Sequence, residues 1–152
     1  AQQLDRITRL IAEGRTDGAE VVTGGARAGE TGYFVQPTII SNTRPEMGVI
    51  REEIFGPVVC ARPFEDEDLD ALAHEANDTE YGLAASIWTN NLGAAHRLAG
   101  KIKSGTVWIN CHNFNDVTMP FGGFKQSGWG RELGAQALDL YSQSKTIAIR
   151  LP

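Results

Sequence analysis

Two adjacent carboxylates, Glu52 and Glu53, lead directly into an aromatic ring, a glycine and a proline. An ionised carboxylate has two oxygens, which can accept hydrogen bonds from a pair of neighbouring hydroxyls. An aromatic ring such as Phe55, two residues later, can stack on a flat ring of the same ligand. A rigid turn at Gly56 and Pro57 would hold the acid and the ring side by side. These residue types suit a ligand that carries both hydroxyls and an aromatic ring.

The same segment also has a simpler interpretation, in which Glu52 and Glu53 are exposed charges where the chain enters a strand. In the ligand-binding interpretation, one of the two carboxylates accepts hydrogen bonds from both hydroxyls of a ribose. Phe55 would then stack on a nicotinamide ring. The residues alone leave both interpretations open.

Length and composition define the broad class. A chain of 152 residues has the length of one domain. The net charge of −5, without any run of basic residues, argues against a nucleic-acid-binding protein. No stretch approaches the roughly 20 apolar residues of a membrane span. Cys60 and Cys111 lie far apart without metal-ligand spacing, and the three histidines have no histidine at i+4, so we expect a cytoplasmic protein without a metal site.

Segments with helical and strand periodicity alternate along the chain, which favours an α/β fold. Gly14 is expected to end the first helix, Asp66 to cap the second and Asn90 or Asn91 the third, and Pro37 indicates an edge strand or a bulge. Helices separating the strands are typical of βαβ units, so a mostly parallel sheet with flanking helices is predicted. Helices are expected over residues 4–14, 69–76, 92–102 and 133–141, and strands over 20–23, 33–40, 58–64, 83–89, 105–110 and 146–151.

A long aromatic loop, residues 111–130, follows the strand that ends at Asn110. Ligands of open α/β sheets bind beyond the carboxyl ends of the strands, so this loop is a candidate pocket wall. Cys111 and His112 could form a nucleophile–base pair, but neighbours at a strand end point to opposite sides. Glycine-rich phosphate cradles are disfavoured too, because Trp129 stands where a P-loop requires lysine.

Several motifs in order resemble those of the aldehyde dehydrogenase superfamily, over essentially the whole chain. They are YFVQPT at 33–38, EEIFGP at 52–57, YGLAA at 81–85, GTVWIN at 105–110, PFGG at 120–123 and KQSG at 125–128. Each is weak alone, but together they are specific. The resemblance implies the C-terminal part of an aldehyde dehydrogenase catalytic domain, residues 1–143, followed by a terminal oligomerisation strand, residues 144–152.

The resemblance also implies roles for particular residues. Glu53 and Phe55 would hold the nicotinamide half of NAD or NADP. The wall of the aldehyde tunnel would be formed by Asn113, Phe114, Asn115 and Phe121. The family's nucleophilic cysteine, general base, oxyanion-hole asparagine and adenine-binding half all precede the matched region. We therefore expect no catalytic residue among these 152, and a truncated chain that is inactive in isolation.

Substrate and assembly follow from the same resemblance. The run Trp-Ile-Asn-Cys-His-Asn at 108–113, followed by Asp116, is most similar to the phenylacetaldehyde dehydrogenase type. The betaine-aldehyde type is second. The expected partners are a small aldehyde and further copies of the chain in a homo-oligomer, with no nucleic acid and no membrane. The alternative from another class is a non-catalytic oligomerisation module.

Overall fold

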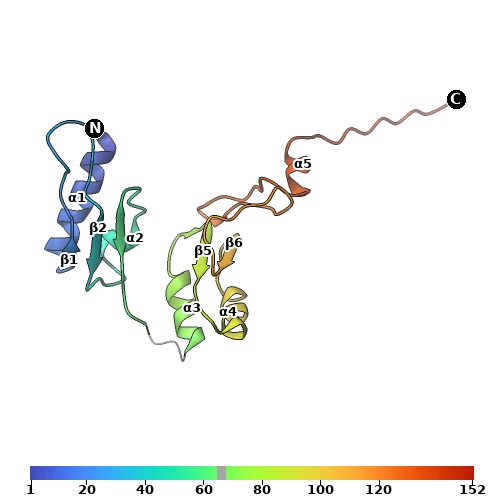
Figure 1. Ribbon diagram of the computed structural model, residues 1–152. Coiled ribbons are helices and arrows are strands. Elements are labelled where there is room, and N and C mark those ends of the chain that lie inside the picture. Colours follow the sequence, from blue (N-terminus) through green and yellow to red (C-terminus); the bar gives the residue numbers. More distant parts are fainter. Residues whose placement is uncertain (65–67) are drawn as a thin grey trace. The chain divides into compact units, whose positions relative to one another are not determined.

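The computed structural model describes residues 1–64 and 68–152 (Figure 1). The chain divides into two compact units, Ala1–Phe64 and Glu65–Pro152. Asp66, expected to cap a helix, lies outside the described residues. The division at 143/144 proposed from the sequence concerns a different boundary and stays a prediction.

The first unit is a helix packed on a small mixed sheet. Its β1 (Glu20–Thr23) pairs antiparallel with β2 (Thr38–Ser41), which pairs in parallel with β3 (Val58–Cys60). The long helix α1 (Gln2–Thr16) contacts the short helix α2 (Gly48–Arg51). One hydrophobic core joins these elements; its fully buried side chains are Leu10, Ile11, Ile40 and Met47.

Helix α1 confirms the apolar spacing seen in the sequence, but the expected stop at Gly14 is wrong. The helix continues to Thr16, and the chain then passes through Gly18 in the left-handed region, with φ of 96°. Gly14 is instead buried against α2, where a Cβ would lie 2.8 Å from Cγ1 of Val49. Its missing side chain allows this close approach.

Two strands of the first unit are shorter than expected. Strand β2 begins at Thr38, directly after Pro37, which has no N–H to donate to a ladder. Of the residues expected to begin this strand, Val35 makes an isolated bridge with Arg27. Strand β3 (Val58–Cys60) ends at Cys60, so residues 61–64, which were expected to continue the strand, lie outside it.

The second unit contains the expected parallel βαβ unit. Strands β5 (Ala84–Ile87) and β6 (Thr106–Ile109) pair in parallel around helix α4 (Leu92–Ala99). The Asn91 side chain caps α4 by accepting from the amide of Ala94, which confirms one of the two expected caps. Helix α3 (Leu69–Asn77) packs on α4 and is capped by Asp68.

The remaining elements differ from the sequence prediction. Strand β4 (Tyr81–Gly82) pairs antiparallel with β7 (Phe124–Lys125), which lies inside the segment expected to be a loop. Helix α5 (Gln136–Leu140) starts later than expected, because Leu133 has a left-handed φ of 60°.

The end of the second unit has no regular structure. Residues 142–152 are exposed and lie outside every helix and strand, so the strand expected at 146–151 does not form within this chain. Figure 1 draws them as an extended trace after α5. A strand formed with another subunit stays a prediction. No helix in the described part of the chain is long and apolar enough to cross a membrane.

Candidate functional site

Residues 52–57, here called the acidic loop, connect α2 to β3 and are held in place by contacts with the hydrophobic core, with α1 and with Thr38. Ile54 is 8% exposed and belongs to the hydrophobic core. Gly56 lies against α1, where a Cβ would be 2.5 Å from Cδ1 of Ile7. The carbonyl of Pro57 accepts a hydrogen bond of 2.8 Å from the amide of Thr38. These contacts leave the loop little freedom to shift.

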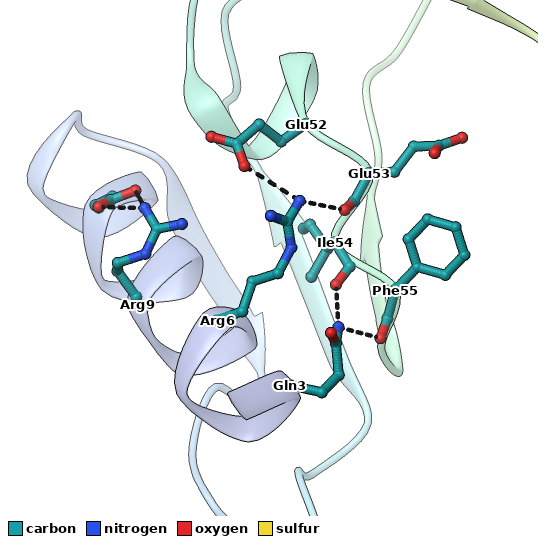
Figure 2. Close-up of polar contacts among 8 residues, drawn as sticks. Gln3, Arg6, Arg9, Glu52, Glu53, Ile54 and Phe55 are labelled. Carbon is teal, nitrogen blue, oxygen red and sulfur yellow. Dashed lines mark hydrogen bonds and ion pairs between the residues drawn. The ribbon is translucent and has the colours of Figure 1, made fainter. Parts of the chain in front are cut away.

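The first turns of α1 bind the acidic loop through side chains (Figure 2). Nε2 of Gln3 donates to the carbonyl of Ile54 at 2.9 Å and to that of Phe55 at 2.8 Å. The Arg6 guanidinium donates to the carbonyl of Glu53 at 2.7 Å and lies 3.1 Å from the Glu52 carboxylate.

The two neighbouring carboxylates thus have different surroundings. Glu52 is paired with Arg6. Among the described residues the Glu53 carboxylate has no hydrogen-bond or ion-pair partner, and Figure 2 shows it on the same side of the loop as the Phe55 ring, away from α1. Of the two carboxylates, Glu53 is therefore the one that can accept hydrogen bonds from a ligand without first breaking an ion pair.

Phe55 has an unusual backbone and an exposed ring. Its φ of 51° is left-handed, a conformation that costs a non-glycine residue roughly 1–2 kcal/mol. Its side chain is 74% exposed. Such strain persists only where surrounding contacts hold it in place, and it is common at ligand-binding positions. The arrangement presents a flat apolar ring beside an unpaired carboxylate.

The second unit carries the expected pocket-wall residues just beyond β6. Asn110 ties the ends of β5 and β6 together, since its side-chain amide bonds both the N–H and the carbonyl of Thr89 at 2.9 Å. Nδ1 of His112 lies 2.8 Å from the Ser86 hydroxyl, and its ring packs edge-on against Trp108. Neither contact involves Cys111, so the structure does not form a thiol–imidazole pair.

Asn113, Phe114 and Asn115 follow one another at a bend in the chain. Asn113 has a left-handed φ of 54°, and its side-chain oxygen accepts from the Asn115 amide at 3.2 Å. The indole of Trp108 donates to the carbonyl of Phe114 at 2.7 Å, while the Phe114 ring is 60% exposed. Next in the chain, hydrogen bonds from Thr118 lower the pKa of the Asp116 carboxyl below its usual value.

Phe121 lies in a different setting from these three residues. Its backbone makes two hydrogen bonds of 2.7 Å with that of Glu132. It lines an open hollow of about 570 Å³ together with Trp129, Arg131 and Tyr141. Asn113, Phe114 and Asn115 are not among the residues that line this hollow, and a common wall formed by all four residues stays a prediction.

Tight backbone turns explain the glycines of this region better than phosphate binding does. A Cβ on Gly123 would lie 2.4 Å from that of Ser127, and one on Gly122 would lie 2.3 Å from the Gly130 carbonyl. Arg131 donates to the carbonyls of Gly123 and Gly130 and stacks over the ring of Phe124. The backbone is folded on itself around these side chains.

The described residues form neither a metal site nor a reactive environment for the Cys60 thiol. Within residues 1–64 and 68–152 no group of His, Cys, Asp and Glu is arranged to hold a metal ion. Cys60 is half-buried with its Sγ 3.4 Å from the Val49 carbonyl, and burial raises the pKa of its thiol. Cys60 packs against the hydrophobic core of the first unit.

Sequence reasoning missed Gln3 and Arg6. Both are polar residues one turn apart on α1, next to the core residue Ile7, and each contacts a loop about 50 residues away. The sequence does show two long hydrogen-bond donors beside the apolar face of α1. It does not show which residues those donors would contact.

Comparison with known proteins identifies the class. The model of the aldehyde dehydrogenase family matches residues 1–147. A betaine aldehyde dehydrogenase of Brucella anthropi is 45% identical over 153 residues, which cover 98% of this chain and 31% of that protein. Among solved structures, an NAD+ complex of an aldehyde dehydrogenase from Bacillus cereus superposes with a TM-score of 0.91 at 45% identity, covering 99% of this chain and 30% of that one.

An indole-3-acetaldehyde dehydrogenase in complex with NAD+ gives the same TM-score of 0.91, at 42% identity and with coverage of 99% and 30%. The chain belongs to the aldehyde dehydrogenase family. It spans about 30% of the length of the curated relatives it matches.

Proposed function

We propose that this chain is the C-terminal segment of an NAD- or NADP-dependent aldehyde dehydrogenase, which oxidises an aldehyde to a carboxylic acid. The observation that supports this most is the acidic loop. It presents the unpaired Glu53 carboxylate and the exposed Phe55 ring on one side of a rigid turn.

The proposed task of this pair is to hold the nicotinamide half of the cofactor. The two oxygens of Glu53 would accept hydrogen bonds from the ribose hydroxyls, and charge-assisted bonds of this kind are the stronger ones. Phe55 would pack on the nicotinamide ring and fix its face. Two similar proteins were solved as NAD+ complexes, which supports a nicotinamide cofactor as the ligand.

The thiol chemistry is assigned to residues outside these 152. In the proposed enzyme a cysteine thiolate would attack the aldehyde carbonyl, the nicotinamide would supply the hydride acceptor, and water would release the acid and regenerate the thiol. Cys60 is unsuited to the attack because burial raises its thiol pKa. Among the described residues Cys111 has no basic partner, and the neighbouring His112 bonds Ser86.

For the substrate we propose an arylacetaldehyde, with a betaine-type aldehyde as the second candidate. Asn113, Phe114 and Asn115 would contribute one wall of the aldehyde tunnel and Phe121 another. The exposed Phe114 ring is suited to an aromatic substrate. Similarity to an indole-3-acetaldehyde dehydrogenase supports the first candidate, and similarity to a betaine aldehyde dehydrogenase supports the second.

For assembly we propose a cytoplasmic homo-oligomer in which residues 144–152 form a strand with another subunit. Its apolar side chains Ile147, Ile149 and Leu151 are 76%, 81% and 80% exposed in the single chain. The same exposure is also consistent with the alternative function, a non-catalytic oligomerisation module. Such a module would not restore aldehyde oxidation when it is joined to the rest of an enzyme.

A chimera separates the two functions. Joining this chain to the upstream part of the Bacillus cereus relative should give an enzyme that reduces NAD in the presence of phenylacetaldehyde. The measurement is the aldehyde-dependent absorbance of NADH, with the same upstream part lacking this segment as the control. A folded chimera that oligomerises but does not bind or reduce NAD would favour the oligomerisation module.

A further inference from the structure

We propose that Ser86, Trp108 and His112 are positioning residues, which fix the orientation of Phe114 and thereby determine how strongly aromatic aldehydes are preferred over small aliphatic ones. This inference rests on the proposed function, in which the Phe114 ring forms part of the wall that meets the substrate. None of the three residues is itself assigned to that wall. They would act on the substrate only through Phe114.

The three side chains form one cluster on the small parallel sheet of the second unit. Ser86 on β5 and Trp108 on β6 are register partners, and such partners in neighbouring strands point to the same face of a sheet. His112 joins them, because its Nδ1 lies 2.8 Å from the Ser86 hydroxyl and its ring lies edge-on to the indole, with 5.3 Å between the ring centroids. The imidazole therefore bridges the two strands just beyond the carboxyl end of β6.

Trp108 connects this cluster to Phe114. Its indole is 8% exposed, and Nε1 donates a hydrogen bond of 2.7 Å to the Phe114 carbonyl, 6 residues later in the chain. This bond folds the segment that follows β6 back onto a side chain of the strand itself. The Phe114 carbonyl is thus held against a buried ring, while the Phe114 side chain stays 60% exposed and free to meet a ligand.

The backbone between Trp108 and Phe114 is strained and depends on these contacts. Asn110 and Asn113 both have a left-handed φ of 54°, which asparagine tolerates better than most residues but which still costs free energy. Asn110 is secured by its two hydrogen bonds to Thr89. Farther along, the indole hydrogen bond ties the segment to the sheet. Loss of the indole donor should therefore let Phe114 change its orientation while β6 stays in place.

The test compares phenylacetaldehyde with propanal as substrates of the active chimera. Trp108→Phe keeps a ring at this position but removes the N–H donor. We expect the KM for phenylacetaldehyde to rise about fivefold, which corresponds to about 1 kcal/mol, the usual contribution of one hydrogen bond. Its kcat should stay near that of the parent, because Phe114 would contact a part of the substrate remote from the reacting carbonyl. Both constants for propanal, which has no ring to pack on Phe114, should be unchanged.

Two further variants and a matched control make the result specific. Ser86→Ala and His112→Ala should raise the same KM by about twofold to threefold, because they loosen the indole but leave its hydrogen bond in place. His112→Asn should restore part of the loss, since an amide can still bond the Ser86 hydroxyl. Trp88→Phe makes the same chemical change on an indole that is 67% exposed and has no hydrogen bond or ring contact among the described residues, so it should change nothing.

A double-mutant cycle with Phe114→Ala separates positioning from a general structural effect. In that background Trp108→Phe should no longer change the preference between the two aldehydes, because coupled residues are non-additive. An unchanged preference in Trp108→Phe, a parallel loss of kcat with both aldehydes, or a full effect in the Phe114→Ala background overturns the inference. If thermal unfolding shows that Trp108→Phe does not fold, Ser86→Ala, which removes a single hydroxyl oxygen, decides by the same criteria.

The same variants keep this inference distinct from the proposed function. If Phe114→Ala leaves the KM for phenylacetaldehyde unchanged, the proposed place of Phe114 in the tunnel wall fails, and the inference fails with it. If Phe114→Ala raises this KM while Trp108→Phe and Ser86→Ala do not, only the positioning role fails.

Discussion

Replacing Glu53 with Gln in the active chimera should weaken NAD binding by about tenfold to a hundredfold. The change keeps the shape of the side chain but removes its charge, and hydrogen bonds to charged groups are worth roughly 1.5–3 kcal/mol. Hydride transfer should slow more than acylation of the thiol, because in the proposed role Glu53 would orient the nicotinamide and would not touch the aldehyde. Rapid-mixing measurements of NADH formation and of acylated enzyme separate the two steps.

Glu52→Gln is the matched control, since it makes the same chemical change at the adjacent position. It removes only the partially exposed ion pair with Arg6, and such pairs contribute about 0–1 kcal/mol. We expect less than a fivefold effect on cofactor binding. A larger effect of Glu52→Gln than of Glu53→Gln would show that Glu52, and not Glu53, binds the ribose.

Removing residues 144–152 should convert dimers or larger species into monomers. The segment is exposed, its apolar side chains are unpaired, and terminal segments stay ordered only when another element holds them. An open strand edge pairs readily with a second chain. The two compact units should remain folded, because residues 142–152 contribute no helix or strand to either.

Sedimentation velocity at micromolar concentration measures this change. Ile149→Asp should act like the deletion, because it places a charge in the proposed interface, whereas Ser142→Ala should not. A chain that is monomeric before truncation, or whose size is unchanged after it, rules out this segment as the subunit contact.

Much of the fold could be predicted because its signals are local. The helical spacing of Ile7, Leu10 and Ile11 gave α1, and alternating strand and helix periods gave β5, α4 and β6 with their parallel pairing. The cap at Asn91 is also a local feature. Each depends on residues a few positions apart.

Other features depend on contacts between distant segments and could not be predicted in this way. Gly14 has the sequence signature of a helix stop, but the packing of Val49 against it decides its role. Strand β7 exists because Phe124 and Lys125 pair with β4, more than 40 residues earlier. Leu133 fits a helical stripe, yet its left-handed backbone delays the start of α5.

The candidate site shows the same division. The sequence placed a carboxylate and a ring two residues apart, and the family resemblance selected Glu53 over Glu52. The physical distinction between them is the Arg6 contact, which joins α1 to the acidic loop across 47 positions. No periodicity encodes that contact.

We expect this chain to supply the carboxylate and the ring that hold the cofactor, and a residue outside these 152 to supply the nucleophile. The most direct test incubates the 152-residue chain with phenylacetaldehyde and NAD and measures its intact mass, with the chimera as the positive control. We predict an acyl adduct on the chimera's upstream cysteine and none on Cys60 or Cys111 of the isolated chain. A stoichiometric acyl thioester on either of those cysteines, accompanied by NADH formation, would show that this chain carries the nucleophile itself.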